Sequence, residues 1–209
     1  MGIQERKERE RERRRQQIMV AARRVFSAKG LEKSTMEDIA KEAELSPGTL
    51  YLYFRNKDEL FASLSLRMLQ FLNIRLEELE QKRTLSVEKK FHVLKKALYD
   101  VYDFDPLVLI NMFHLQSSET LKNLSDELIQ EIKTLSRKSL RSMAHVFEEG
   151  IKEKRFIERH PTAMADSLWA LFSGIVLWEE SKKIIDDNKN YLKPTLDLAF
   201  EIFWRGVCA

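Results

Sequence analysis

The chain has 209 residues, of which 44% are hydrophobic and 33% charged, so it can bury a core and is not expected to be disordered. Six isolated glycines and four prolines favour long helices and exclude a glycine-rich phosphate-binding loop. The net charge of +3 is unevenly placed, because residues 1–15 hold seven Lys or Arg residues against four Glu. This excess of positive charge points to a polyanionic partner near the N-terminal end. A solvated arm without a partner explains the charge pattern of residues 1–15 equally well.

The cysteine content and the lengths of the hydrophobic segments indicate in which cellular compartment the protein works. The single cysteine, Cys208, excludes an internal disulfide and fits a reducing cytoplasm. We find no signal peptide, and the longest nearly apolar run, residues 168–178, is far too short to span a membrane. We therefore expect a cytoplasmic protein without a membrane partner.

The first three predicted helices are short or moderate in length. Residues 1–15 are expected to form a flexible arm, helical only where they continue the helix predicted over residues 14–29, which Gly30 ends. A second helix follows, with Ser34 or Thr35 as its N-cap. A third begins with Ser46 as N-cap and Pro47 at its first position, and ends near residue 53 or 54.

Longer helices fill the remainder. Asn56 and Glu59 are expected to cap a fourth helix reaching about residue 82. Five more are predicted over residues 86–103, 105–116, 118–152, 161–181 and 191–207. The apolar stripe of the helix over residues 118–152 is interrupted near Ser139, where we expect a bend or a change of the buried face. The sequence thus predicts an all-α protein of about nine helices.

The third helix raises a question of stability, because a helix of about seven residues does not persist alone in water. Leu50 and Phe54 are four residues apart and predict its inward face. The other face carries Gly48, Leu52 and Arg55, flanked by Thr49 and Tyr51. Two short helices joined by a tight turn and braced by a preceding helix make a helix-turn-helix, whose outward face fits a DNA major groove.

Each outward residue has a plausible role on DNA. Gly48 allows close backbone approach, and the hydroxyls of Thr49 and Tyr51 can bond base edges or phosphates. Leu52 suits a thymine methyl group. Lys57, in the first turn of the fourth helix, suits a phosphate. The competing interpretation is that Tyr51 and Tyr53 simply pack between helices.

Residues 16–62 resemble the DNA-binding domain of the TetR family of transcriptional repressors. The family pattern is matched at thirteen positions: Thr35, Ile39, Ala40, Ala43, Ser46, Gly48, Thr49, Leu50, Tyr51, Tyr53, Phe54, Lys57 and Leu60. The resemblance implies an N-terminal helix-turn-helix domain at residues 16–62 and a larger ligand-binding and dimerisation domain at residues 63–209. It further implies a ligand-released repressor that reads a palindromic operator as a homodimer. The predicted DNA contacts are Thr35, Ser46, Pro47, Gly48, Thr49, Tyr51, Leu52, Tyr53 and Lys57. Glu44 stands where the family usually has a turn glycine, so a positive φ is expected there.

The C-terminal part predicts two further surfaces. Residues 168–178 are apolar nearly all round a helix and residues 196–207 over a broad arc, so one side can face the core and another a second subunit. The family's dimer interface coincides with these segments, and the residues predicted for it are Leu168, Ile175, Leu196, Phe200 and Phe203. Aromatic, methionine and polar side chains in the middle predict a pocket for a small apolar or amphipathic effector, as in the family. The residues predicted to line it are Tyr102, Asn111, His114, Met143, Phe147, Trp169 and Phe172, with Gln116 as a further polar candidate.

Two other functional classes remain open. An enzyme is disfavoured because the four histidines are scattered and no hydrolase or metalloprotease motif is present; we predict no catalytic residue and no cofactor. Asp186, Asn188, Asn190 and Asp197 mimic part of a calcium loop but lack its glycine, and we predict no metal site. The second alternative is a helical ligand-binding or interaction module without DNA binding, against which the intact outward face argues.

Overall fold

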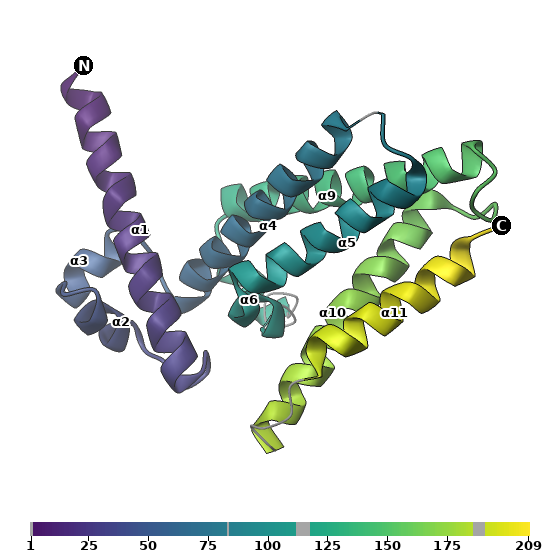
Figure 1. Ribbon diagram of the computed structural model, residues 1–209. Coiled ribbons are helices and arrows are strands. Elements are labelled where there is room, and N and C mark those ends of the chain that lie inside the picture. The colour runs from purple at the N-terminus through teal and green to yellow at the C-terminus, as the bar shows by residue number, and fades with distance from the viewer. Residues whose placement is uncertain (1, 83, 112–117, 186–190) are drawn as a thin grey trace. The chain divides into compact units, whose positions relative to one another are not determined.

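The computed structural model describes residues 2–82, 84–111, 118–185 and 191–209 (Figure 1). Its described residues form helices and no strand, with one isolated bridge between Phe156 and Cys208, which confirms the all-α prediction. None of the helices in these ranges combines the length and apolar content needed to cross a membrane. The helices within the described ranges are α1 (Ile3–Lys29), α2 (Met36–Glu42), α3 (Pro47–Tyr51), α4 (Lys57–Gln81), α5 (Val87–Phe104), α6 (Pro106–Ile110), α8 (Ser118–Lys122), α9 (Asp126–Lys152), α10 (Pro161–Ile185) and α11 (Leu192–Val207).

The chain divides into two compact units. The first unit comprises Met1–Arg67 and Asn111–Gln130, and the second comprises Met68–Ile110 and Glu131–Ala209. The predicted domain boundary after residue 62 stays a prediction. The sequence did not indicate that α8 and its flanking residues belong with the N-terminal helices. Both α4 and α9 are continuous helices that contribute residues to both units.

α1 begins far earlier than expected, because residues 3–13 continue the helix in place of a flexible arm. Arg, Glu, Gln and Lys lose little side-chain freedom in a helix, so the segment extends readily once the buried half from Ile18 to Phe26 is fixed. The Gly2 N–H donates to the Glu5 carboxylate at 3.2 Å, and Gln16 donates to Glu12 at 2.6 Å. Figure 1 shows α2 and α3 beside α1, whose N-terminal part extends past them.

The predicted caps of α2 and α3 are confirmed. Thr35 accepts from the Asp38 N–H and the Asp38 carboxylate accepts from the Thr35 N–H, both at 3.1 Å, which closes a capping box. Ser46 accepts from the Thr49 N–H at 3.1 Å, with Pro47 at the first helical position.

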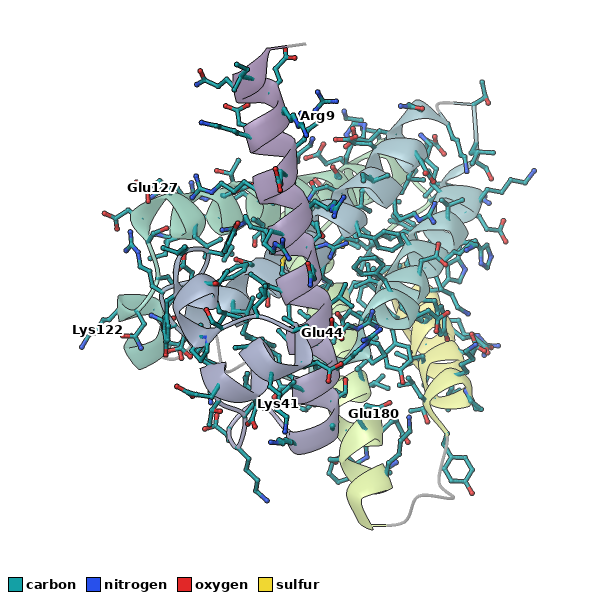
Figure 2. The ribbon with its side chains drawn as sticks, turned by 90° about the vertical axis from the view of Figure 1, so that its left-hand side faces the viewer. Arg9, Lys41, Glu44, Lys122, Glu127 and Glu180 are labelled. Carbon is teal, nitrogen blue, oxygen red and sulfur yellow. The ribbon has the colours of Figure 1, made fainter. Side chains whose placement is uncertain are left out.

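The turn between α2 and α3 is a Schellman motif centred on Glu44, labelled in Figure 2. Glu44 has φ 56°, as the departure from glycine led us to expect. Its N–H donates to the Lys41 carbonyl at 3.1 Å, and the Leu45 N–H donates to the Ala40 carbonyl at 2.9 Å. The turn therefore ends α2 sharply enough for α3 to begin within a few residues.

α4 and α9 run parallel within the second unit. The buried Asn73 donates to the Leu135 carbonyl at 3.1 Å and to the Ser139 hydroxyl at 2.9 Å. Ser139 is thus a buried polar residue with a partner, which explains why the apolar stripe skips there. α9 continues through Ser139 without a break, from Asp126 to Lys152.

The single helix expected over residues 118–152 is instead split into α8 and α9. Ser125 accepts from the Leu128 N–H at 3.3 Å and so caps α9. Asp126 and Glu127 in the first turn favour a helix start at this point. Ser125, Asp126 and Glu127 are typical of a helix N-terminus, but the apolar stripe continues past them, so the sequence pattern predicts one helix.

An aromatic cluster of Phe91, Phe147, Phe156, Phe203 and Trp204 joins α5, α9 and α11. Its ring centroids lie 4.9–6.2 Å apart in pairs, within the range of favourable aromatic contact. α10 and α11 also pack against each other, and Thr195 donates to the buried Glu179 at 3.0 Å.

Candidate nucleic-acid interface

α3 presents two large side chains to solvent. Its inward residue, Leu50, and the following Phe54 are almost fully buried, as the four-residue spacing predicted. Tyr51 and Leu52 are 47% and 75% exposed. An isolated helix of this length would unfold, so its neighbours hold it in place while its outer face remains open.

Two hydroxyl side chains lie at the start of α3, and a third lies at the start of α2. The Thr49 and Ser46 hydroxyls lie 2.9 Å apart, and the Ser46 oxygen also caps the helix. Thr35 is exposed and caps α2 with its oxygen as acceptor. One of the Ser46 and Thr49 hydroxyls donates to the other, so this pair keeps one hydroxyl proton for a phosphate oxygen. The Thr35 hydroxyl accepts from a cap N–H and keeps its own proton.

Gly48 is exposed and has no steric need to be glycine within the protomer. A Cβ built on it meets only the Ser46 hydroxyl, at 3.9 Å, which is an ordinary contact. A requirement for glycine at this position would therefore come from a partner that approaches the backbone closely.

Lys57 does not offer its ammonium freely to a phosphate. Its Nζ donates to the carbonyls of Leu31, Glu32 and Ser34 at 2.8, 3.1 and 3.2 Å. An ammonium has three N–H bonds, so these three acceptors saturate it. Lys57 therefore fastens the start of α4 to the loop between α1 and α2, and its predicted phosphate contact would need one of these bonds to open.

Two α1 residues that the sequence did not single out fix the position of α3. Arg15 donates to the Tyr53 carbonyl at 3.0 Å and its guanidinium lies 4.4 Å from the centre of the Phe54 ring. Gln17 donates to the Ala43 carbonyl at 2.9 Å, at the end of α2. Tyr53 is consequently half-buried, whereas Tyr51 is open.

A groove of about 320 Å³ separates α3 from the N-terminal half of α1. Leu52 and Tyr53 form one side. The other is formed by Lys7, Glu10, Arg11 and Arg14, three of which are basic.

The predicted dimer-interface residues divide into two groups. Leu168, Leu196 and Phe200 are at most 2% exposed, so they pack the protomer's own core and have no surface left for a partner. Ile175 and Phe203 are half-buried. Among the side chains of α10 and α11 whose burial is described, the large apolar ones left open are instead Trp178, Leu198 and Ile202, at 63%, 58% and 62% exposure.

The predicted pocket residues lie in several places. Phe147 belongs to the aromatic cluster, whereas Trp169 and Phe172 contact each other with ring centroids 5.7 Å apart. Tyr102 donates to Glu180 at 2.5 Å, and burial followed by this carboxylate raises the pKa of the Tyr102 phenol.

Two of the remaining predicted pocket residues are described and two are not. Met143 is buried and Asn111 is half-buried. His114 and Gln116 lie outside the described residues.

The weak calcium-loop pattern finds no support at its described member. Asp197 pairs with Lys95 at 2.6 Å and accepts from the Tyr99 hydroxyl at 3.0 Å, contacts that hold the Asp197 pKa below its usual range. Asp186, Asn188 and Asn190 lie outside the described residues. In the part of the chain that the structure describes, no three His, Cys, Asp or Glu side chains gather closely enough to hold a metal ion.

Comparison with known proteins bears on both units. Residues 18–64 match the family model described as "Bacterial regulatory proteins, tetR family". Over 194 residues the chain is 30% identical to a Bacillus subtilis fatty acid metabolism regulator protein, covering 91% of this chain and 94% of that one. A Haemophilus influenzae HTH-type transcriptional regulator is 32% identical over 111 residues, where the match spans only 57% of that protein.

A solved structure extends the likeness to the fold. The transcriptional regulator FadR from Bacillus subtilis, in complex with stearoyl-CoA, superposes with a TM-score of 0.70 at 24% identity. The match covers 92% of this chain and 98% of that one.

Proposed function

Because this chain belongs to the TetR family of bacterial regulatory proteins, we propose that it represses transcription by binding a palindromic operator as a homodimer and is released by a long-chain acyl-coenzyme A. The observation that carries the DNA-binding part is the outward face of α3, where Tyr51 and Leu52 are exposed on a helix too short to persist unless it is braced. The predicted contacts Ser46, Pro47, Gly48 and Thr49 lie in the first turn of the same helix, and Thr35 caps α2.

Dimerisation supplies the second reading helix that a palindrome requires. The exposed apolar side chains of Trp178, Leu198 and Ile202 on two packed helices are suited to a second copy of the same pair. We place the subunit interface on these residues together with Ile175 and Phe203.

The effector class rests on the relatives. The Bacillus subtilis relative is named a fatty acid metabolism regulator, and the Bacillus subtilis FadR structure holds stearoyl-CoA. An acyl thioester is amphipathic, in agreement with the effector expected from the sequence. Met143, Trp169 and Phe172 of the second unit remain the proposed apolar lining, with Tyr102 of the same unit as a polar group.

The helices offer a route from effector to DNA. α4 and α9 each continue from one unit into the other. Within the first unit, Asn56 donates to the Asn123 carbonyl at 3.1 Å and Asn123 donates to Asp58 at 2.8 Å, so the chain after α8 is fastened to the start of α4. A change in α4 or α9 therefore reaches the helix-turn-helix, whose two copies must lie about 34–36 Å apart to enter successive major grooves.

A regulator of this kind performs no catalysis and works in the cytoplasm with the DNA that it regulates. The alternative without DNA binding is disfavoured by the open α3 face. Selection of bound fragments from random duplex DNA tests the proposal, and we expect palindromic fragments with half-sites about one helical turn apart. If no duplex is enriched, the DNA-binding proposal fails.

The effector is tested separately on the selected duplex. Stearoyl-CoA, below its micelle concentration, should weaken binding by about 5- to 150-fold, the usual range of such coupling. Coenzyme A alone should have no such effect, because it lacks the apolar chain. Unchanged affinity with acyl-CoA of every chain length would remove the effector proposal and leave DNA binding standing.

A further inference from the structure

We propose that the helical extension of α1 is a second DNA-contacting element, which holds the sugar-phosphate backbone through Lys7, Arg11 and Arg14. The proposal rests on the proposed function and adds to it a phosphate-binding groove outside the helix-turn-helix. Its basis is the groove of about 320 Å³ between these three side chains and the end of α3.

The basic side chains lie on one stripe of α1. Positions 7, 11 and 14 are spaced by four and three residues, so they share a helix face. They extend over about 10 Å of the helix axis. A DNA strand carries a phosphate every 3.4 Å of its axis, so three cations on this stripe can face several phosphates of one strand.

The groove is placed beside the reading surface by a shared residue. Leu52 lines the groove and is also 75% exposed on the outward face of α3. A duplex lying against α3 therefore brings its backbone to the mouth of the groove.

The groove is also held firmly. Arg15, next to Arg14, bonds the Tyr53 carbonyl and lies on the Phe54 ring, which fastens α1 to the end of α3. Arg14 itself donates to Gln17 at 2.9 Å, and Gln17 holds the end of α2. The cations are thus pre-positioned by a helix, which lowers the entropy that binding would cost.

The charge favours an anion despite the interleaved glutamates. Glu10 is the one acidic residue among the six that line the groove, against three basic ones. Arg9 and Arg13 lie about 120° or more round the axis from the centre of the stripe. The extension therefore offers two faces with cations, and only one of them adjoins α3.

The two faces provide a matched test. The salt dependence of binding to the selected duplex would be measured for the full chain, for the Lys7→Gln/Arg11→Gln variant, and for the Arg9→Gln/Arg13→Gln variant. Each variant removes two positive charges. For the first pair we expect the slope of log affinity against log salt to become shallower by about 0.9 for each phosphate that is no longer neutralised, up to about 1.8. The second pair should change the slope by less than half as much.

Two controls separate charge from folding. The Lys7→Arg/Arg11→Lys variant keeps both charges and should keep the wild-type slope, and circular dichroism should show equal helix content for all variants. Equal slope changes in both glutamine pairs would mean a diffuse charged tail and overturn the proposal, as would an unchanged slope in both. Failure of the wild-type chain to bind any duplex would instead refute the proposed function.

Discussion

At the scale of single residues, Glu44 holds a left-handed backbone conformation that glycine adopts without cost. Such a conformation costs an L-residue about 1–2 kcal/mol, partly offset by the greater freedom that glycine has when unfolded. We expect Glu44→Gly to raise the free energy of unfolding by about 0.5–1 kcal/mol in urea titrations. Lys41→Gly, in the right-handed last turn of α2, should lower it by about 1 kcal/mol. A drop in stability in both variants would contradict the turn described here.

Asp38 predicts a pH dependence of stability. The hydrogen bond from Lys29, followed by that from the Thr35 N–H, lowers the Asp38 pKa below its ordinary value of 3.8. The carboxylate therefore contributes stability that is fully present above pH 3.8 and is lost as the pH falls through the lowered folded value.

Thermal unfolding of the wild type and Asp38→Asn between pH 7 and pH 2 measures this contribution. The wild type should melt higher at neutral pH, and the difference should shrink toward zero in acid. Lys29→Gln removes the hydrogen bond that lowers the Asp38 pKa most. In the Lys29→Gln background, the difference in melting temperature between the chain with Asp38 and the Asp38→Asn variant should therefore be smaller. A difference that stays constant to pH 2 would refute the assignment.

Residue roles in the first unit were largely readable from the sequence because capping and turn chemistry are local. The Thr35 and Ser46 caps and the positive φ of Glu44 follow from residues within four positions. The role of Lys57 did not, since its three carbonyl partners lie 23 to 26 positions away. Local spacing cannot report an acceptor set of that kind.

At the scale of elements, α9 ends in a turn that requires Gly150. A Cβ there would lie 2.0 Å from Cδ2 of Phe156, whose ring is buried in the aromatic cluster. Gly150→Ala must therefore displace that ring, and we expect the free energy of unfolding to fall by about 1–3 kcal/mol. Gly206→Ala in α11 has open space and should gain up to about 1 kcal/mol. Equal effects of the two substitutions would show that Phe156 does not occupy this position.

Helix existence was predictable and some helix limits were not. Apolar periodicity located α4, α5, α10 and α11 within a few residues. The α8–α9 break was missed because the stripe from Leu121 to Leu135 remains in register across it. The α1 extension was underestimated because its alternating charges are typical of a solvated arm, whereas attachment to a buried helix makes such a segment helical.

At the scale of the whole molecule, reading a palindrome requires two chains. Ile202→Glu would place a carboxylate in the proposed subunit interface, where an unpaired buried charge costs about 3–5 kcal/mol. We expect its dimer dissociation constant to rise at least about 100-fold in analytical ultracentrifugation. Ile74→Glu, on an isoleucine of α4 that is 54% exposed, should leave it unchanged. An unchanged dimer dissociation constant in Ile202→Glu would show that Ile202 does not lie in the subunit interface.

The subunit interface shows the limit of sequence reasoning at this scale. Apolar residues on α10 and α11 were recognised, but periodicity does not say which side faces the core. Leu168, Leu196 and Phe200 proved to be core, while Trp178, Leu198 and Ile202 are open. Which side of an all-apolar helix its own chain covers depends on contacts distant in sequence.

DNA reading by the outward face of α3 is tested most directly by the affinity of the full chain for its selected duplex in fluorescence anisotropy. Tyr51→Ala should weaken binding by about 5- to 150-fold, as expected when one good contact of about 1–3 kcal/mol is removed, with unchanged thermal stability. Tyr191→Ala, which removes a tyrosine of similar exposure (56% against 47%) outside the helix-turn-helix, should leave binding unchanged. Equal affinity of the Tyr51→Ala and Tyr191→Ala variants would contradict a DNA-reading role for this face.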